Sequence, residues 1–488
     1  MSFLLIVIYS LLALSLWIYG LNCYVMIYLH IAGKKKILAN WKEFSLTDEM
    51  YPVVTTQIAV YNECNVIERV VEACAKMEYP QGKHFIQILD DSTDETVFKI
   101  DGLIDYWTEE GCQIEVIRRQ GRLGYKAGAL ANAHSRIQGE FVAVFDADFI
   151  PEKNFLLATV PEILKSEKVG LLQARWGHVN EKSSFLTRAQ SLGIDGHFMI
   201  EQSARSWNGL YMNFNGTAGL WRVEAIEEAG GWQWDTLTED MDLSYRAQLK
   251  GWETRYRPDI VVPAEIPESV NAFKSQQFRW AKGSIQTAMK ILPGMIKEKG
   301  FSFKTGQAFL HMTHYIVHPL MLFLALLSLP VQVFVKEEVG LFYFAFIGAL
   351  LVLSVAAPNC LYIVSQKMAY EKWQRRLLFL PALVVIGTGI AINNSKAVFE
   401  ALFKKESGFI RTPKNGQKEI VSYHSKCSKL VLCEILLGIY CAVSLYVTLG
   451  SQHYYIGPFL LVYTIAFLSI GIMSLKHDLG KNFFKIKI

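Results

Sequence analysis

The sequence has no CxxC pair among its eight cysteines, no internal repeat and no low-complexity segment. The lack of paired cysteines argues against a disulfide framework and against a structural zinc site. The net charge of +4 is small and falls beside apolar stretches, so we expect contact with anionic lipid and no nucleic-acid partner. A hydrophobic content of 51% is too high for an ordinary soluble protein of 488 residues.

Long apolar runs predict an integral, multi-pass membrane protein. Residues 3–29 are almost continuously apolar and precede three lysines at 34–36, which predicts a spanning helix within 1–36 whose far end is cytoplasmic. A cleaved signal peptide is the alternative, but it needs basic residues before the apolar run. Four further stretches are long enough to span, at 308–335, 341–365, 428–449 and 453–475.

A fifth stretch in the C-terminal half, Leu377–Ile392, is marginal for a bilayer and contains Pro381. Basic residues flank it on both sides, so both flanks are expected on the cytoplasmic side. We therefore predict five spans in all, with residues 372–405 at or within the inner interface and not crossing it. Residues 301–488 would form a membrane domain with about four spans.

Residues 45–300 have short apolar runs separated by charged turns, which predicts a water-soluble cytoplasmic domain. Three runs, VVTTQIAV at 53, FIQIL at 85 and FVAVF at 141, alternate with possible helices and predict a parallel sheet in an α/β fold. Each run ends in polar residues. Because ligands bind beyond the carboxyl ends of such strands, the polar clusters are expected to share one cleft.

Acidic residues dominate these clusters. Asp146 and Asp148 lie two apart, so on an extended segment they point the same way and suit one hard cation that also binds phosphate. Mg²⁺ or Mn²⁺ fits carboxylate ligands, whereas zinc prefers His or Cys. Acids in turns also cap helices, and that explanation stays open for this pair and for Asp90 and Asp91.

Two further patterns have a chemical and a structural interpretation. Glu239 and Asp240 either supply a general base or favour the first turn of a helix through its dipole. Gln276, Arg279 and Trp280 share one helix face. There the indole suits a sugar ring and the guanidinium a diphosphate, or the two side chains sit in a membrane interface.

Eight motifs occur in order between about 53 and 415: QILDDSTDET, GYKAGAL, FDADF, QARW, FNGTAGLWR, TEDMDL, QQFRW and FIRTPK. With these motifs the chain resembles processive family 2 glycosyltransferases of the cellulose synthase superfamily. Within that superfamily it is most similar to plant cellulose-synthase-like mannan and glucan synthases. The resemblance implies a GT-A, Rossmann-like catalytic domain beside α-helical membrane spans.

The resemblance also implies roles for single residues at the donor site. Asp90 and Asp91 would contact the nucleotide, and Lys126 would reach its diphosphate. Asp148, assisted by Asp146, would hold the metal.

At the acceptor site, Asp240 beside Glu239 would be the general base, and Arg279 would bind the pyrophosphate. The residues expected to bind the acceptor are Phe214, Asn215, Gly216, Thr217, Gln276 and Trp280.

The segment FIRTPK matches a gating-loop pattern within 406–416, although Arg411 replaces the usual Val and Pro413 stiffens it. The match implies that Thr412 and Lys414 reach the diphosphate of the bound nucleotide.

The implied activity is an inverting polymerisation of a β-linked glucan or mannan from UDP-glucose or GDP-mannose, coupled to export of the chain. Its partners would be the nucleotide sugar, the growing polysaccharide, the lipid bilayer and accessory export subunits. One alternative is a lipid glycosyltransferase that adds a sugar to a diacylglycerol, ceramide or polyprenyl acceptor. A non-catalytic scaffold or transporter is the other, but it has no use for Asp148, Asp240 and Arg279 together.

Overall fold

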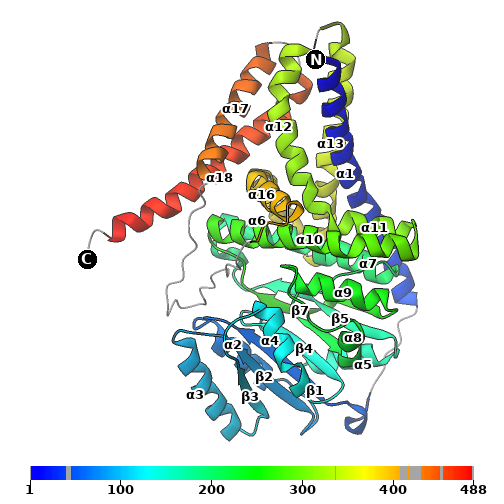
Figure 1. Cartoon of the computed structure of the whole chain (residues 1–488), viewed down its shortest axis with the longest axis vertical. Helices are drawn as coiled ribbons and strands as arrows, with labels where there is room; N and C mark the ends of the chain where they lie inside the picture. The colour runs from blue at the N-terminus through cyan, green and yellow to red at the C-terminus, as the bar shows by residue number, and fades with distance from the viewer. Residues whose placement is uncertain are drawn as a thin grey trace.

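The computed structural model describes residues 2–39, 46–335, 337–406, 416, 430–450 and 454–485. A sheet covered by helices lies at one end of the molecule and a bundle of long helices at the other (Figure 1). The strands are β1 (Val54–Val60), β2 (His84–Asp90), β3 (Ile114–Arg118), β4 (Phe141–Asp146), β5 (Val169–His178), β6 (Gly219–Arg222) and β7 (Glu253–Ala264).

Short helices belong to the sheet domain and long ones mostly to the bundle. Those up to the last strand are α1 (Ser2–Ala39), α2 (Ile67–Ala75), α3 (Thr96–Glu109), α4 (Tyr125–Ala133), α5 (Phe155–Leu164), α6 (Phe185–Gly196), a π-helix (His197–Gln202), α7 (Ser203–Trp207), α8 (Val223–Glu228) and α9 (Glu239–Leu249). Those after it are α10 (Val270–Lys299), α11 (Phe303–Met312), α12 (Val317–Phe334), α13 (Glu337–Ala369), α14 (Trp373–Arg376), α15 (Leu380–Gly389), α16 (Ala391–Leu402), α17 (Val431–Gly450) and α18 (Gly457–Lys485).

The sheet has the strand order β3-β2-β1-β4-β6-β5-β7. β1 is parallel to β2 and to β4, with Val54 opposite both His84 and Phe141, and β6 is antiparallel to its two neighbours. The three strands expected from the sequence are therefore confirmed within one or two residues. Because β5 and β7 run parallel to β4 beyond β6, their carboxyl ends reach the same edge of the sheet as those of β1, β2 and β4.

Apolar residues bury both faces of the sheet. One core joins the strands to α2, α3 and α5 through residues such as Val70, Ile100 and Phe155, all almost fully buried. A second core on the other face contains Leu130 of α4 and Leu243 of α9. This α/β/α layering is the GT-A, Rossmann-like arrangement that the sequence predicts, and burial of strands on both faces explains their near-continuous apolar sequence.

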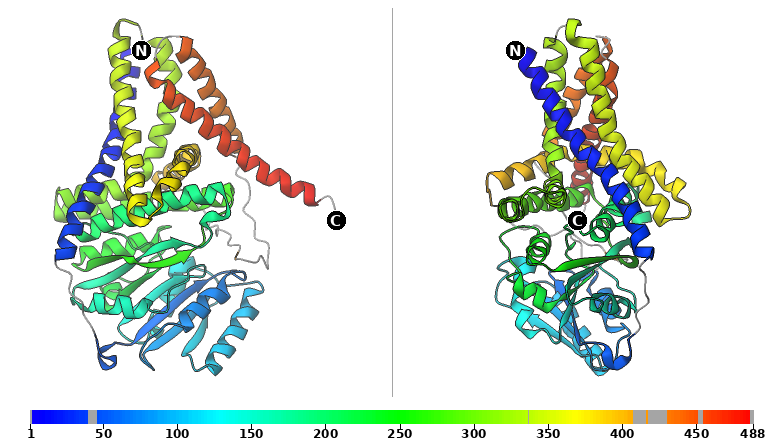
Figure 2. Two further views of the ribbon diagram at one scale, coloured as in Figure 1. Left: turned by 180° about the vertical axis from the view of Figure 1, so that it is seen from behind. Right: turned by 90° about the vertical axis from the view of Figure 1, so that its right-hand side faces the viewer.

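Three helices, α6, α10 and α11, lie crosswise between the sheet domain and the bundle (Figures 1 and 2). Ser269 begins α10 by accepting a hydrogen bond from the Ala272 backbone N–H at 3.1 Å, and Gly300 ends it with a φ of 68° that favours glycine. α6 and α11 begin with reciprocal Ser–Thr capping contacts, at Ser184 and Ser302. The edge of the sheet domain and the bundle thus meet through well-capped helices.

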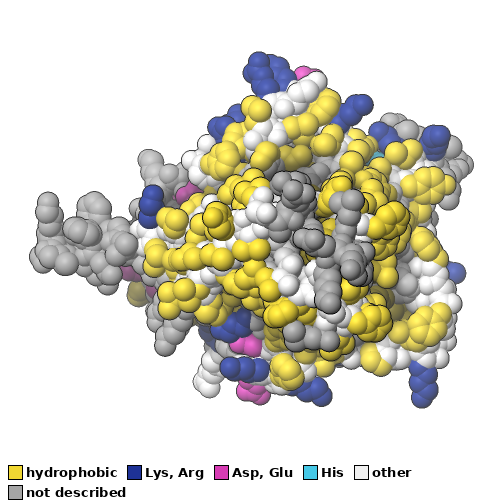
Figure 3. Space-filling model, turned by 90° about the horizontal axis from the view of Figure 1, so that it is seen from above, with side chains coloured by type: hydrophobic (Ala, Val, Ile, Leu, Met, Phe, Trp, Pro, Cys, Tyr) yellow, Lys and Arg dark blue, Asp and Glu magenta, His cyan; other side chains and the backbone are white. Residues whose placement is uncertain are grey.

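Within the described residues, five helices are long and apolar enough to cross a membrane, at 2–35, 314–334, 342–369, 431–450 and 457–476. They match the five stretches expected from the sequence. Large apolar side chains such as Leu11, Phe342 and Tyr446 are exposed on them, which suits contact with lipid. Seen from the bundle end, hydrophobic side chains cover much of the described surface and most Lys and Arg lie toward its margin (Figure 3).

The segment 372–405 forms α14 to α16 and bends by 43° between Gly389 and Ala391. The helical residues 373–389 and 391–402 would form a sixth span only if the two parts crossed the membrane together. α16 packs along α10 at the foot of the bundle (Figure 1). That this segment stays in the interface remains a prediction.

We expect a cysteine at Lys405, an exposed residue just after α16, to react with a membrane-impermeant thiol reagent from the same side as a cysteine at Glu68 in the sheet domain. In a background without native thiols, Lys336→Cys in the segment between α12 and α13 provides the opposite-side control, because one candidate span separates it from the sheet domain whether or not 372–405 crosses. Labelling of Lys405→Cys from the same side as Lys336→Cys would refute the five-span prediction.

Candidate active site

One cavity lies at the carboxyl edge of the sheet, and the crosswise helix α10 contributes to its lining. It brings together the ends of β1, β2, β4, β5 and β7 with the start of α9 and the middle of α10, which lie far apart in the sequence. Its charged and aromatic lining residues are Tyr61, Glu63, Asp91, Arg122, Lys126, Asp146, Asp148, Phe149, Trp176, His178, Glu239, Asp240, Glu265, Arg279 and Trp280. The shared cleft expected from the sequence is therefore present.

Asp146 and Asp148 form the acidic wall at the end of β4. Asp146 is paired with Lys126, and its backbone N–H donates to Thr217 Oγ1 at 2.9 Å. Asp148 is 4% exposed, and its Oδ2 accepts a hydrogen bond of 3.2 Å from the Glu265 backbone N–H. No group of three or more His, Cys, Asp or Glu side chains that could hold a metal occurs in the described part of the chain. Asp146 and Asp148 offer two carboxylates to the cavity, so a hard cation held there would take its other ligands from a diphosphate and water.

Basic residues after β3 hold the acids after β2. Arg119 binds Asp91 in a bidentate pair, with Nε–Oδ1 2.8 Å and Nη2–Oδ2 2.7 Å, and Arg122 lies over the Tyr61 ring at 3.1 Å. Asp91, Arg122 and Tyr61 line the end of the cavity nearest β1 and β2, and Arg119 holds Asp91 from outside the lining. Asp90 is different: its side chain is buried against Arg118 Nε at 2.8 Å and lies outside the cavity lining, because neighbouring strand residues point to opposite faces.

The motif GYKAG explains how Lys126 enters the cavity. Gly124 precedes α4 with a φ of 71°, and a Cβ there would lie 2.6 Å from the Trp234 ring. A Cβ at Gly128 would lie 1.9 Å from the Leu123 carbonyl oxygen. These two glycines allow the close turn that aims Lys126 at Asp146 and at the Gly216 carbonyl oxygen, 2.7 Å away.

The TEDMDL motif begins α9 with three acids that have different surroundings. Asp242 is fully buried and accepts from Arg246 Nε at 2.8 Å, so it has a structural role. Glu239 and Asp240 line the cavity. Burial, followed by the neighbouring charge of Glu239, raises the pKa of Asp240 to about 7, and burial also raises the pKa of Glu239. A carboxyl group with a pKa near neutrality suits proton transfer.

The transfer rate should therefore fall as the pH drops below about 7, because protonated Asp240 cannot accept a proton. We expect Glu239→Gln to move the midpoint of this pH profile to lower pH, since it removes a negative charge that raises the pKa of Asp240. The profile of kcat/KM measures the effect. Glu227→Gln on α8 removes the same charge from an exposed site and should leave the midpoint unchanged. An unmoved or alkaline midpoint in Glu239→Gln contradicts the assignment.

The FNGT segment is divided between the cavity and the core. Asn215 and Gly216 line the cavity, and a Cβ at Gly216, where φ is 84°, would lie 3.0 Å from Asp240 Oδ2. Phe214 and Thr217 are fully buried outside the lining: Phe214 packs on Trp221, and Thr217 bonds to the Asp146 backbone. Their contacts therefore fix the segment between the two groups of acids.

The helix α10 presents Gln276, Arg279 and Trp280 to the cavity from one face, as the spacing predicts. The Trp280 ring lies 6.4 Å from that of Trp176 at the end of β5. Burial lowers the pKa of Arg279, while the charges of Glu239 and Asp146 raise it. The guanidinium of Arg279 is therefore close enough to Glu239 and Asp146 to feel their charges, and the two indoles line the same cavity.

Sequence reasoning missed Arg119, Arg122 and His178. The basic run RRQGR at 118–122, directly after the third strand, was a usable signal for the two arginines. His178 stands alone at the end of an apolar run and gave no such signal. Thr412 and Lys414, expected to reach the diphosphate, lie outside the described residues, so their role stays a prediction.

Comparisons with known proteins agree with this site. The family model described as "Glycosyltransferase like family 2" matches residues 52–283. The chain is 33% identical to a probable glucomannan 4-beta-mannosyltransferase 11 of Arabidopsis thaliana over 448 residues, which cover 88% of this chain and 98% of that protein. The chain belongs to glycosyltransferase family 2, in its cellulose-synthase-like branch. It is therefore a glycosyltransferase.

Other relatives of this family 2 glycosyltransferase match over less of their length. A probable glucomannan 4-beta-mannosyltransferase 7 of rice (Oryza sativa subsp. japonica) is 42% identical over 271 residues, 54% of this chain and 46% of the rice protein, so the match spans about half of that relative. Among solved structures, a mannosyltransferase of Pyrobaculum calidifontis in complex with GDP-Man and Mn²⁺ has a TM-score of 0.51 at 19% identity, covering 82% of this chain and all of that one. This likeness supports the GT-A fold.

Proposed function

We propose that the chain is a membrane-embedded, inverting synthase that transfers mannose from GDP-mannose to a growing β-1,4-linked mannan or glucomannan. The observation that carries the proposal is one cavity that joins Asp146 and Asp148, Asp240, and Arg279 with Trp280 at the foot of the membrane bundle. The names of the relatives, glucomannan 4-beta-mannosyltransferases, support mannose as the sugar and a β-1,4 linkage.

The nucleotide would lie at the β1 and β2 end, against Asp91 and Arg122, with its diphosphate between Lys126 and Arg279. Asp146 and Asp148 would hold a divalent cation, Mg²⁺ or Mn²⁺, which when bound neutralises charge on the leaving diphosphate. The sugar would then reach toward Asp240, next to Gly216.

Asp240 would take the proton from an acceptor hydroxyl as that oxygen attacks the anomeric carbon. The new C–O bond forms on the face opposite the diphosphate, whose bond to the sugar breaks, so one displacement inverts the configuration and gives a β linkage. Trp280 would offer its ring to the apolar face of an acceptor sugar. The five apolar helices beyond α10 would carry the exported chain across the membrane.

Incubation of purified membranes with labelled GDP-mannose or UDP-glucose, followed by digestion of the product with linkage-specific hydrolases, tests the proposal. We expect an insoluble or high-mass product from GDP-mannose that a β-1,4-mannanase degrades. Incorporation from UDP-glucose alone, or a product that extracts into organic solvent as a glycolipid, would refute it.

A further inference from the structure

The carboxyl end of β5 brings two ring side chains to the cavity. Trp176 and His178 lie two residues apart on this strand and both line the cavity. In the sheet, β5 lies two strands beyond β4, on the side away from β1 and β2. His178 is therefore on the opposite side of the acidic pair from Asp91, in the half of the cavity that holds Trp280.

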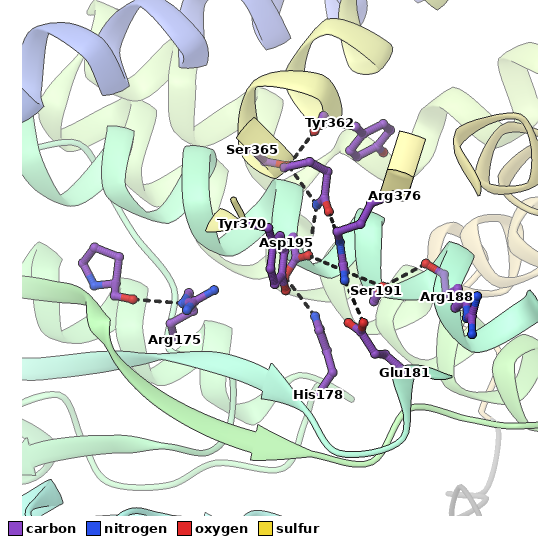
Figure 4. Close-up of polar contacts among 12 residues, drawn as sticks. Arg175, His178, Glu181, Arg188, Ser191, Asp195, Tyr362, Ser365, Tyr370 and Arg376 are labelled. Carbon is purple, nitrogen blue, oxygen red and sulfur yellow. Dashed lines mark hydrogen bonds and ion pairs between the residues drawn. The ribbon is translucent and has the colours of Figure 1, made fainter. Parts of the chain in front are cut away.

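A buried carboxylate fixes the imidazole of His178. Its Nε2 lies 2.9 Å from Oδ1 of Asp195 on α6, a residue that is 1% exposed (Figure 4). Burial alone would raise the pKa of Asp195, but hydrogen bonds from His178 and Gln366 and the charge of Arg376 lower it. A carboxylate only accepts hydrogen bonds, so Nε2 carries its proton. In the neutral ring, Nδ1 is then an acceptor, and it makes no hydrogen bond to any described residue.

The same carboxylate is bound from the membrane side. Gln366 of α13 donates to Asp195 Oδ2 at 3.0 Å, and Tyr370, just after α13, donates to Oδ1 at 3.3 Å. Arg376 of α14 lies 3.3 Å from Oδ2 and also pairs with Glu181 at 2.7 Å (Figure 4). These partners come from the inner end of a predicted span and from the start of the interface segment. The orientation of His178 thus depends on where the membrane helices lie.

We propose that His178 binds a hydroxyl of the acceptor saccharide through Nδ1, and that Asp195 and Arg376 are positioning residues that couple this contact to the membrane domain. The ligand class is a β-linked oligosaccharide, whose hydroxyls can donate to Nδ1 while a ring face lies on Trp280. The proposal deepens the proposed function and rests on it, because it assumes a saccharide acceptor.

Two substitutions of His178 separate binding from structure. The Gln side chain places its amide near the Nε2 position, so His178→Gln keeps the hydrogen bond to Asp195 and loses the group at Nδ1. The Asn side chain does the reverse, because its amide oxygen or nitrogen takes the Nδ1 position. If His178 had only a structural role, His178→Gln should therefore keep the wild-type acceptor affinity and His178→Asn should lose it. If His178 binds the acceptor, we expect the opposite result.

The measurement uses the full chain in detergent or nanodiscs, with labelled GDP-mannose as donor and β-1,4-mannohexaose as acceptor. We expect His178→Gln to raise the acceptor KM by on the order of tenfold, the effect of one lost hydrogen bond, with the donor Kd unchanged. His178→Asn should stay within about threefold of the wild-type acceptor KM, because it keeps that hydrogen bond, and should lower Tm. Equal KM values in wild type and His178→Gln, or a weaker donor Kd in that variant, would overturn the proposal.

Arg376→Lys tests the positioning. It keeps the charge and loses the fork that reaches both Asp195 and Glu181. We expect a smaller rise in the acceptor KM, and no further rise when Arg376→Lys is combined with His178→Gln, because both act on one contact. Additive effects would refute the coupling. If the wild type elongates no mannohexaose with either GDP-mannose or UDP-glucose, the proposed function is wrong. If the wild type elongates mannohexaose and His178→Gln has the same acceptor KM, only the role of His178 is wrong.

Discussion

Replacing Asp240 by Asn is expected to lower the rate of sugar transfer by about 10²–10⁴-fold, the contribution of a general base. The amide keeps the shape of the side chain and can still accept the 2.8 Å hydrogen bond from the Met241 backbone N–H, so α9 should start as before. It cannot accept the proton of the acceptor hydroxyl. Nucleotide affinity should change little, because Asp91, Lys126 and Arg279 remain in place.

Asp242→Asn, two residues along the same helix, is the matched control. Asp242 is buried on Arg246 and points away from the cavity, so its loss should cost about 3 kcal/mol of stability and leave the rate per folded molecule near wild type. Single-turnover transfer and nucleotide binding are measured for both variants, with Tm as the test of folding. A wild-type rate in Asp240→Asn would exclude Asp240 as the base.

Much of the fold and of the site could be predicted because patterns within short stretches of sequence determine the strands and the helix faces. The runs that became β1, β2 and β4 end in their polar residues within a few positions, and parallel strands must bring those ends together. The face of Gln276, Arg279 and Trp280 follows from helix spacing alone. The family motifs then indicated which acids belong in one cavity.

Contacts across long separations were not predictable from one sequence. The pairing of Arg119 with Asp91 depends on the register between β2 and β3, which the pattern of neither strand fixes. Asp195 contacts His178, which ends a strand 17 residues earlier, and it also contacts Gln366, which lies 171 residues later. Which residues of FNGT line the cavity and which are buried in the core depends on how β6 pairs with β4. Such tertiary packing decides which of several identical residue types faces the ligand.

The proposed metal role of Asp148 gives the other large expected effect. Asp148→Asn keeps one oxygen for the Glu265 backbone N–H and removes the carboxylate charge, so the fold should persist while the divalent cation loses a ligand. We expect the affinity for Mn²⁺ in the presence of GDP-mannose to fall by about a hundredfold or more, since even loss of an outer-shell partner costs 10–100-fold.

Titration of nucleotide binding with Mn²⁺ measures this effect, and Asp259→Asn, an exposed acid paired with Arg257, is the control that should match wild type. Excess Mn²⁺ should restore part of the nucleotide affinity of Asp148→Asn, because the remaining ligands, Asp146 and the diphosphate, can still bind the ion weakly. If Asp148→Asn lost nucleotide affinity because its fold had changed, excess Mn²⁺ would not restore that affinity. If the wild-type enzyme transfers mannose at an unchanged rate after removal of divalent ions with EDTA, the acidic pair does not act through a metal, and its proximity to Lys126 would have to be explained by charge balance alone.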